Sequence, residues 1–138
     1  MSESTETLFE QALEKYQAGE AAANLIPTFQ EICTNEPKNS AAWTCLTWLY
    51  LLEEKPQEAL KAAQRSVKLE PRDPQSQLNL ALAMLDSGQK GVRKHIEIVQ
   101  QAIDFDETIK STIKENIDEG LERKPDWKSL EKAKNWLF

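Results

Sequence analysis

Residues 39–74 read NSAAWTCLTWLYLLEEKPQEALKAAQRSVKLEPRDP, and they carry the clearest helical pattern in the chain. Trp43, Leu46 and Tyr50 are spaced three and four positions apart, so a helix places them on one apolar face. The pattern predicts a helix from about Ser40 to Glu53 that packs this face against a neighbouring helix.

A second helix is predicted after a tight turn. Pro56 suits its first turn, where the missing N–H costs no hydrogen bond, and Ala59 and Ala63 follow at helical spacing. Pro71 closes this unit 34 positions after Pro37. The same interval separates a further set of residues, Tyr16, Tyr50 and Met84. A fixed period of this length predicts stacked helix pairs.

This unit resembles the tetratricopeptide repeat (TPR) family, whose pattern is Trp, Leu, a small residue, Tyr, a small residue, an aromatic and a closing Pro. The matching residues are Trp43, Leu46, Tyr50, Ala59 and Pro71. Thr47 stands where Gly or Ala is usual, and Ala63 replaces the aromatic. The flanking repeats match at fewer positions, namely Phe9, Tyr16, Phe29 and Pro37 before the unit and Leu80, Ala81, Gly88 and Ala102 after it.

The resemblance implies an all-α fold, a right-handed TPR solenoid of about three helix pairs with C-terminal capping helices. We expect residues 1–107 to hold three TPR-like repeats, about 5–38, 39–73 and 74–107. Residues 108–138 are expected to form the capping helices, because a solenoid must cover its last apolar face.

Capping signals place the ends of several helices. Asp73 followed by Pro74 predicts a helix start, and Gly88 predicts the end of that helix. Pro27 would break a helix interior, so we expect Asn24 to cap a shortened helix over Leu25–Asn35 that holds Pro27 in its first turn.

The tail, residues 126–138, carries an apolar face made by Trp127, Leu130, Ala133 and Leu137. Neighbouring helices joined by short turns usually pack against each other, so we expect the tail to extend the solenoid. The alternative is that it folds back to bring Trp127 and Leu130 near Trp48 and Leu82.

Composition excludes several classes of function. The chain has a net charge of −6, and residues 1–40 carry seven Glu against two Lys, which disfavours binding to nucleic acid or anionic lipid. The longest apolar run, Ala41–Leu52, has twelve residues, whereas a membrane span needs about 20. We expect no membrane insertion. Cys33 and Cys45 lack metal-ligand spacing, so we expect no metal, and two buried thiols without a signal peptide suggest the cytoplasm.

The sequence contains no catalytic motif, and we expect no enzyme activity and no cofactor. His95 is the single histidine, and we expect a structural side chain there. The acidic pair Glu53 and Glu54 precedes a turn and is expected to be solvated.

The concave surface of this fold is built mostly from the first helix of each pair. We expect a partner-binding groove that is acidic at one end and apolar at the other, lined by Glu10, Gln11, Glu14, Thr44, Cys45, Trp48, Leu51, Leu52, Leu78, Asn79, Leu82 and Leu85. Trp48 is the expected binding anchor, whereas Trp43 is expected inside the helix pair. An exposed apolar patch of this size needs a cover, either a partner or the C-terminal helices.

Chaperone-binding TPR proteins hold a terminal carboxylate with Lys, Arg and Asn. The matching positions here are Thr7, Gln11, Cys45, Gln75 and Asn79, and none is cationic, so acidic chaperone C-terminal tails are disfavoured as partners. We expect another protein as partner, with an apolar segment and basic flanks. The resemblance implies a TPR adaptor, scaffold or assembly factor. The alternative is a permanent structural subunit or homo-oligomer whose groove is filled by its own C-terminal helix.

Overall fold

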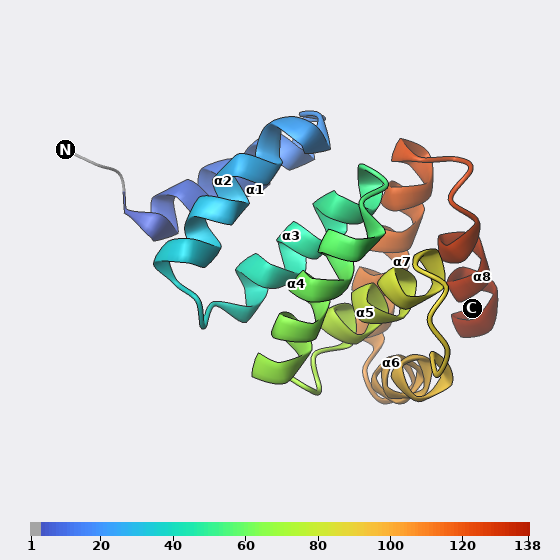
Figure 1. The fold of residues 1–138 in the computed structure, drawn as a ribbon. Coiled ribbons are helices and arrows are strands. Elements are labelled where there is room, and N and C mark those ends of the chain that lie inside the picture. The colour runs from blue at the N-terminus through green and yellow to red at the C-terminus, as the bar shows by residue number, and fades with distance from the viewer. Residues whose placement is uncertain (1–3) are drawn as a thin grey trace.

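A computed structural model describes residues 4–138, and within this range the chain forms eight α-helices and no strand. They are α1 (Thr5–Gln17), α2 (Ala22–Asn35), α3 (Ser40–Leu52), α4 (Pro56–Leu69), α5 (Pro74–Asp86), α6 (Arg93–Phe105), α7 (Glu107–Arg123) and α8 (Lys128–Leu137). Consecutive helices up to α6 pack as pairs, and the pairs follow one another from the N-terminal end (Figure 1). The expected all-α class, three helix pairs followed by C-terminal helices, is confirmed.

Local side-chain chemistry explains most helix starts. Ser4, Asn39 and Asp73 each accept a hydrogen bond from a main-chain N–H three residues later, which satisfies a donor that the helix leaves unpaired. Pro56 and Pro74 lie in first turns, as expected.

Helix α2 corrects one expectation. It starts at Ala22 and not at Leu25, and Pro27 lies inside it. The main-chain N–H of Asn24 already bonds to the carbonyl of Ala21 at 3.0 Å, so Asn24 belongs to the first turn and does not cap the helix. Pro27 is tolerated because it and Ala23, whose carbonyl loses its helical donor, are both exposed to solvent.

Two apolar clusters form the core. The smaller one joins α1, α2 and the near side of α3 around Phe29, Ile32 and Leu49, and the larger one extends from α3 to α8. Trp43 is only half-buried, and its indole N–H donates to the carbonyl of Pro37 at 2.9 Å. Trp48 is 8% exposed and belongs to the larger cluster. Trp43 is therefore less buried than expected, although it packs against the smaller cluster, and Trp48 is more buried than expected.

The C-terminal helices pack onto the concave side as well as onto each other. Trp127, in the turn before α8, is 2% exposed and its ring centroid lies 5.2 Å from that of Trp48. Its indole N–H donates to Asp86 at 3.1 Å, and Leu130 is fully buried in the same cluster as Leu82. The expectation that the tail only extends the solenoid is wrong, because α8 packs against α5 and α6 as well as against α7.

Gly120 allows α7 to approach Trp48 closely. A Cβ at this position would lie 2.7 Å from Cζ2 of Trp48 and 2.8 Å from Cδ2 of Leu130, both in buried side chains. The side chains of Trp48 and Leu130 would have to shift to accommodate this Cβ, and such shifts are costly in a densely packed core.

Gly120→Ala should therefore destabilise the protein by about 1–3 kcal/mol, the usual cost of overpacking a core. In an exposed helix interior the same change would stabilise by about 1 kcal/mol. Chemical denaturation measures the free energy of unfolding, and Ser111→Ala on the exposed face of the same helix is the matched control. A Gly120→Ala protein as stable as the control would contradict this packing.

Candidate functional site

The apolar half of the expected groove is closed in this structure. Trp48, Leu51, Leu78 and Leu82 are buried in the cluster that also contains Ile113, Ile117, Trp127 and Leu130 from the C-terminal segment. The expectation of an open apolar patch is corrected by this burial, since α7 and α8 supply the cover. Leu85 and Leu52 are half-buried and pack against this cluster, and Leu52 also lines a small cavity of about 310 Å³.

An open groove of about 710 Å³ remains between the first helix pair and α7. Its walls come from five regions of the chain, and they are lined by Leu13, Tyr16, Gln17, Gly19, Phe29, Thr44, Cys45, Trp48, Leu49, Gln75, Asn79, Glu115, Asn116, Glu119, Glu122 and Arg123. Four of the expected residues line it, namely Thr44, Cys45, Trp48 and Asn79.

The α1 wall differs in register from the expectation. Glu10, Gln11 and Glu14 are exposed and lie outside the lining, which α1 supplies with Leu13, Tyr16 and Gln17 instead. Glu10 and Glu14 therefore contribute negative charge on α1, and none of the three expected residues contributes surface within the groove.

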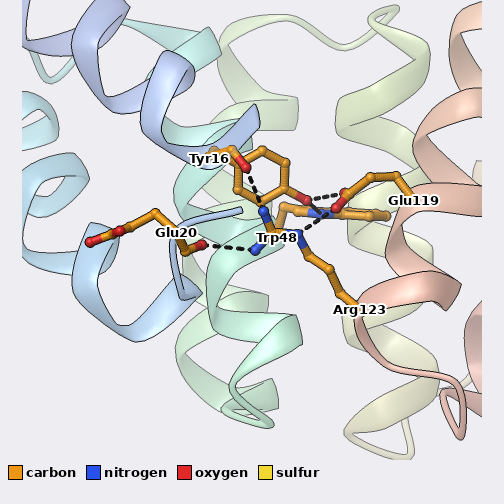
Figure 2. A network of polar contacts seen from close by, with 5 residues as sticks. All are labelled: Tyr16, Glu20, Trp48, Glu119 and Arg123. Atoms are coloured by element: carbon orange, nitrogen blue, oxygen red, sulfur yellow. Dashed lines mark hydrogen bonds and ion pairs between the residues drawn. The ribbon is translucent and has the colours of Figure 1, made fainter. Parts of the chain in front are cut away.

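Tyr16 connects the first helix pair to α7 across one end of the groove. Its hydroxyl donates to Glu119 and accepts a hydrogen bond of 2.8 Å from the indole N–H of Trp48 (Figure 2). Arg123 pairs with Glu119, lies 3.8 Å above the Tyr16 ring and donates to the main-chain carbonyl of Glu20 at 3.0 Å. We call these four side chains, Tyr16, Trp48, Glu119 and Arg123, the clasp.

The clasp combines hydrogen bonds, an ion pair and a cation–π contact in one connected network. Glu119 and Arg123 are one helical turn apart with the acid first, the favourable order for such a pair. Arg123 is largely buried, and its guanidinium also donates to the main-chain carbonyls of Glu20 and Tyr16. The clasp therefore fixes the position of α1 relative to α7 and with it the width of the groove.

The clasp also makes stability depend on pH. Burial, and then the hydrogen bond to Glu119, raise the pKa of Tyr16 well above its ordinary value of about 10. Above about pH 10 the unfolded chain loses the Tyr16 proton while the folded protein keeps it. The free energy of unfolding therefore falls as pH rises.

Tyr16→Phe should remove the part of this fall in the free energy of unfolding that Tyr16 causes. We expect the free energy of unfolding of the variant, measured by denaturation between pH 9 and 11, to fall less steeply with pH than that of the original chain. Equal slopes for the two proteins would contradict a half-buried Tyr16 that keeps its proton in the folded state.

A row of carboxamides crosses the floor of the groove. Asn116 donates to Gln75 at 2.9 Å, Gln75 donates to Asn79 at 2.8 Å, and Asn79 donates to the main-chain carbonyl of Thr44 at 3.0 Å. These bonds hold three helices in register, and they fix the orientation of each amide.

The described side chains of the groove offer no activated nucleophile. Burial, followed by the neighbouring Cys33, raises the pKa of Cys45 to about 12, so its thiol stays protonated near neutral pH. His95 lies outside the groove; its Nδ1–H donates to Gln77 at 2.6 Å, and burial lowers its pKa. Within residues 4–138 no group of His, Cys, Asp and Glu is arranged to hold a metal ion.

Sequence reasoning missed the α7 wall. Asn116, Glu119 and Arg123 are spaced three and four apart, so they form a stripe beside the apolar stripe of Ile113 and Ile117. That second, polar stripe is the signal that could have shown that α7 contributes a wall to the groove.

The comparisons with known proteins support the fold. No protein-family model and no curated protein matches the chain. Among solved structures it is similar to a crystal structure of the Yersinia enterocolitica type III secretion translocator chaperone SycD, in an alternative dimer. The identity is 17%, the TM-score is 0.63, and the match covers 99% of this chain and 91% of that chain. The part of the chain described here, 4–138, has no helix long and apolar enough to cross a membrane.

Proposed function

We propose that this chain is a non-enzymatic TPR-type adaptor that receives a segment of another protein in the groove between α1 and α7. The observation that carries the proposal is the groove itself, an opening of about 710 Å³ on a concave face that the chain's own helices otherwise cover. Ligand-binding pockets commonly measure about 300–1,000 Å³. This volume suits a short segment of a partner.

The chemistry of the groove favours recognition over catalysis. Its walls combine apolar side chains, fixed amides and carboxylates, which is the composition of a specific binding site. The structural likeness to a chaperone supports a protein as the ligand.

The charge of the groove disfavours acidic partners. Arg123, the cation among its described lining residues, is already paired with Glu119, and the exposed Glu10 and Glu14 lie on α1 beside the opening. An apolar segment with basic flanks therefore remains the favoured partner, and acidic chaperone tails remain disfavoured.

A permanent structural subunit is the second candidate. Phe105 is 90% exposed, Trp136 46% and Phe138 41%, and an assembly that covers them would bury apolar surface now in water. Light scattering over a concentration series tests for self-association, because a permanent homo-oligomer leaves no monomer at micromolar concentration.

The adaptor proposal is tested by photo-crosslinking followed by a binding measurement. A photoreactive amino acid at Gln17 or Glu122, which line the groove, should crosslink one partner in a lysate of the native organism. The same group at Glu31 or Lys61, which are exposed on α2 and α4, should not.

The crosslinked partner is then purified and its affinity measured. Gln17→Trp, which fills part of the groove from an exposed position, should weaken binding at least tenfold, whereas Lys61→Trp should not. Equal affinities for the two variants would contradict the proposal.

A further inference from the structure

We propose that the groove selects an extended segment that places a lysine or arginine side chain on the α7 carboxylates Glu115 and Glu122. This inference rests on the proposed function and names the chemistry of the partner. It is carried by two observations, the unneutralised carboxylates on one wall and the aligned amides on the floor.

The carboxylates of α7 differ in how they are engaged. Glu119 receives both the Tyr16 hydroxyl and Arg123. Glu115 and Glu122 stand about one turn to either side of it, both exposed and both lining the groove. The ion pairs found among residues 4–138 include neither of them.

The two free carboxylates face the same opening. They are seven residues apart, which is two turns and about 10 Å along the helix axis, so they lie on one side of α7. No cation of the described lining is left to neutralise them, because Arg123 is held in the clasp. A basic side chain from a partner fits this charge, and an acidic one is repelled.

The amides determine the conformation of the segment. The bonds of the row from Asn116 through Gln75 to Asn79 do not use the carboxamide oxygen of Asn116 or the second N–H of Gln75. A helical partner satisfies its main chain internally, whereas an extended one needs donors and acceptors from its binding site. The half-buried Asn116 and Gln75 supply both kinds of group in the groove.

A displayed library of random twelve-residue peptides is the probe. It is selected on the immobilised full-length protein, and peptides that bind the Gln17→Trp protein equally well are discarded. The remaining, groove-dependent peptides should be enriched in Lys or Arg at one shared position, and the bound state of the tightest one should show the NMR contacts of an extended chain.

The carboxylates are then tested with that peptide. Glu115→Gln combined with Glu122→Gln should weaken its affinity about fivefold to tenfold, as expected for two partly exposed charge pairs. Replacing the peptide's basic residue by Gln should weaken its affinity by about the same factor. Combining this peptide with the double Glu→Gln variant should weaken the affinity little further. The control is Glu31→Gln combined with Glu58→Gln, which changes the net charge equally at exposed sites outside the lining. It should change affinity less than twofold.

Three outcomes would overturn the inference. Groove-dependent peptides without an enriched basic residue, equal losses in the two double variants, or a helical bound peptide would each contradict the partner chemistry while leaving the groove as the binding site. A selection that yields no groove-dependent peptide would contradict both this inference and the proposed function.

Discussion

Removal of residues 126–138 is expected to cost most of the protein's stability. The deleted segment contains four buried side chains, those of Trp127, Leu130, Ala133 and Leu137. Each large one contributes about 1.5–3 kcal/mol when fully buried, so the three together account for roughly 5–9 kcal/mol, against a total of about 5–15 kcal/mol for a typical domain. Chemical denaturation followed by circular dichroism measures the loss.

The matched control for this truncation is Trp136→Ala. Trp136 belongs to the same helix but is 46% exposed, so the substitution should cost less than about 1 kcal/mol. A truncated protein that unfolds at nearly the original denaturant concentration would show that α8 does not cover the concave face in solution.

The truncation also tests whether the tail only covers the concave face or competes with a partner for the groove. The lining of the open groove ends at Arg123, before the deleted segment. Any truncated protein that remains folded should therefore bind a groove ligand no more tightly than the full chain. Tighter binding would mean that the tail competes with the partner.

Trp48→Ala is expected to destabilise the protein by about 3–5 kcal/mol, the range for truncating a buried aromatic side chain. The indole contacts Gly120 and Trp127 and donates its N–H to Tyr16, so its loss leaves a cavity and removes one member of the clasp. Thermal and chemical denaturation measure the effect.

Trp43→Ala is the comparison for this variant. Trp43 is the same residue type on the same helix, but it is half-buried, and its main polar contact is the carbonyl of Pro37. Trp43→Ala should lower the free energy of unfolding clearly less than Trp48→Ala does. If Trp43→Ala proves the more damaging of the two, the assignment of Trp48 to the core is wrong.

The fold was predictable because its signals are local. The period of Trp43, Leu46 and Tyr50 and the pair Asp73–Pro74 act through residues within one or two turns, and the structure has helices at both places. Pro27 shows the limit of such signals. A proline usually ends a helix, but here burial of Leu25, Ile26 and Phe29 in the smaller apolar cluster outweighs the lost hydrogen bond.

The site was less predictable because it depends on contacts between distant parts of the chain. Tyr16 and Glu119 are 103 residues apart, and Asn116 and Gln75 are 41 apart. The helical period predicted Trp48 on the concave side of its helix, yet the period carries no information about which part of the chain lies opposite. The position of α7 decides that Trp48 is a core residue and that Glu115 and Glu122 line the groove.

Hydrogen exchange of the full-length protein with and without a bound groove peptide tests the central claim most directly. The account predicts that the peptide slows amide exchange in the second half of α1 and in residues 115–123 of α7, with little change in α4 and α6. Slower exchange confined to α4 or α6, with α1 and α7 unaffected, would contradict the claim that the partner binds between α1 and α7.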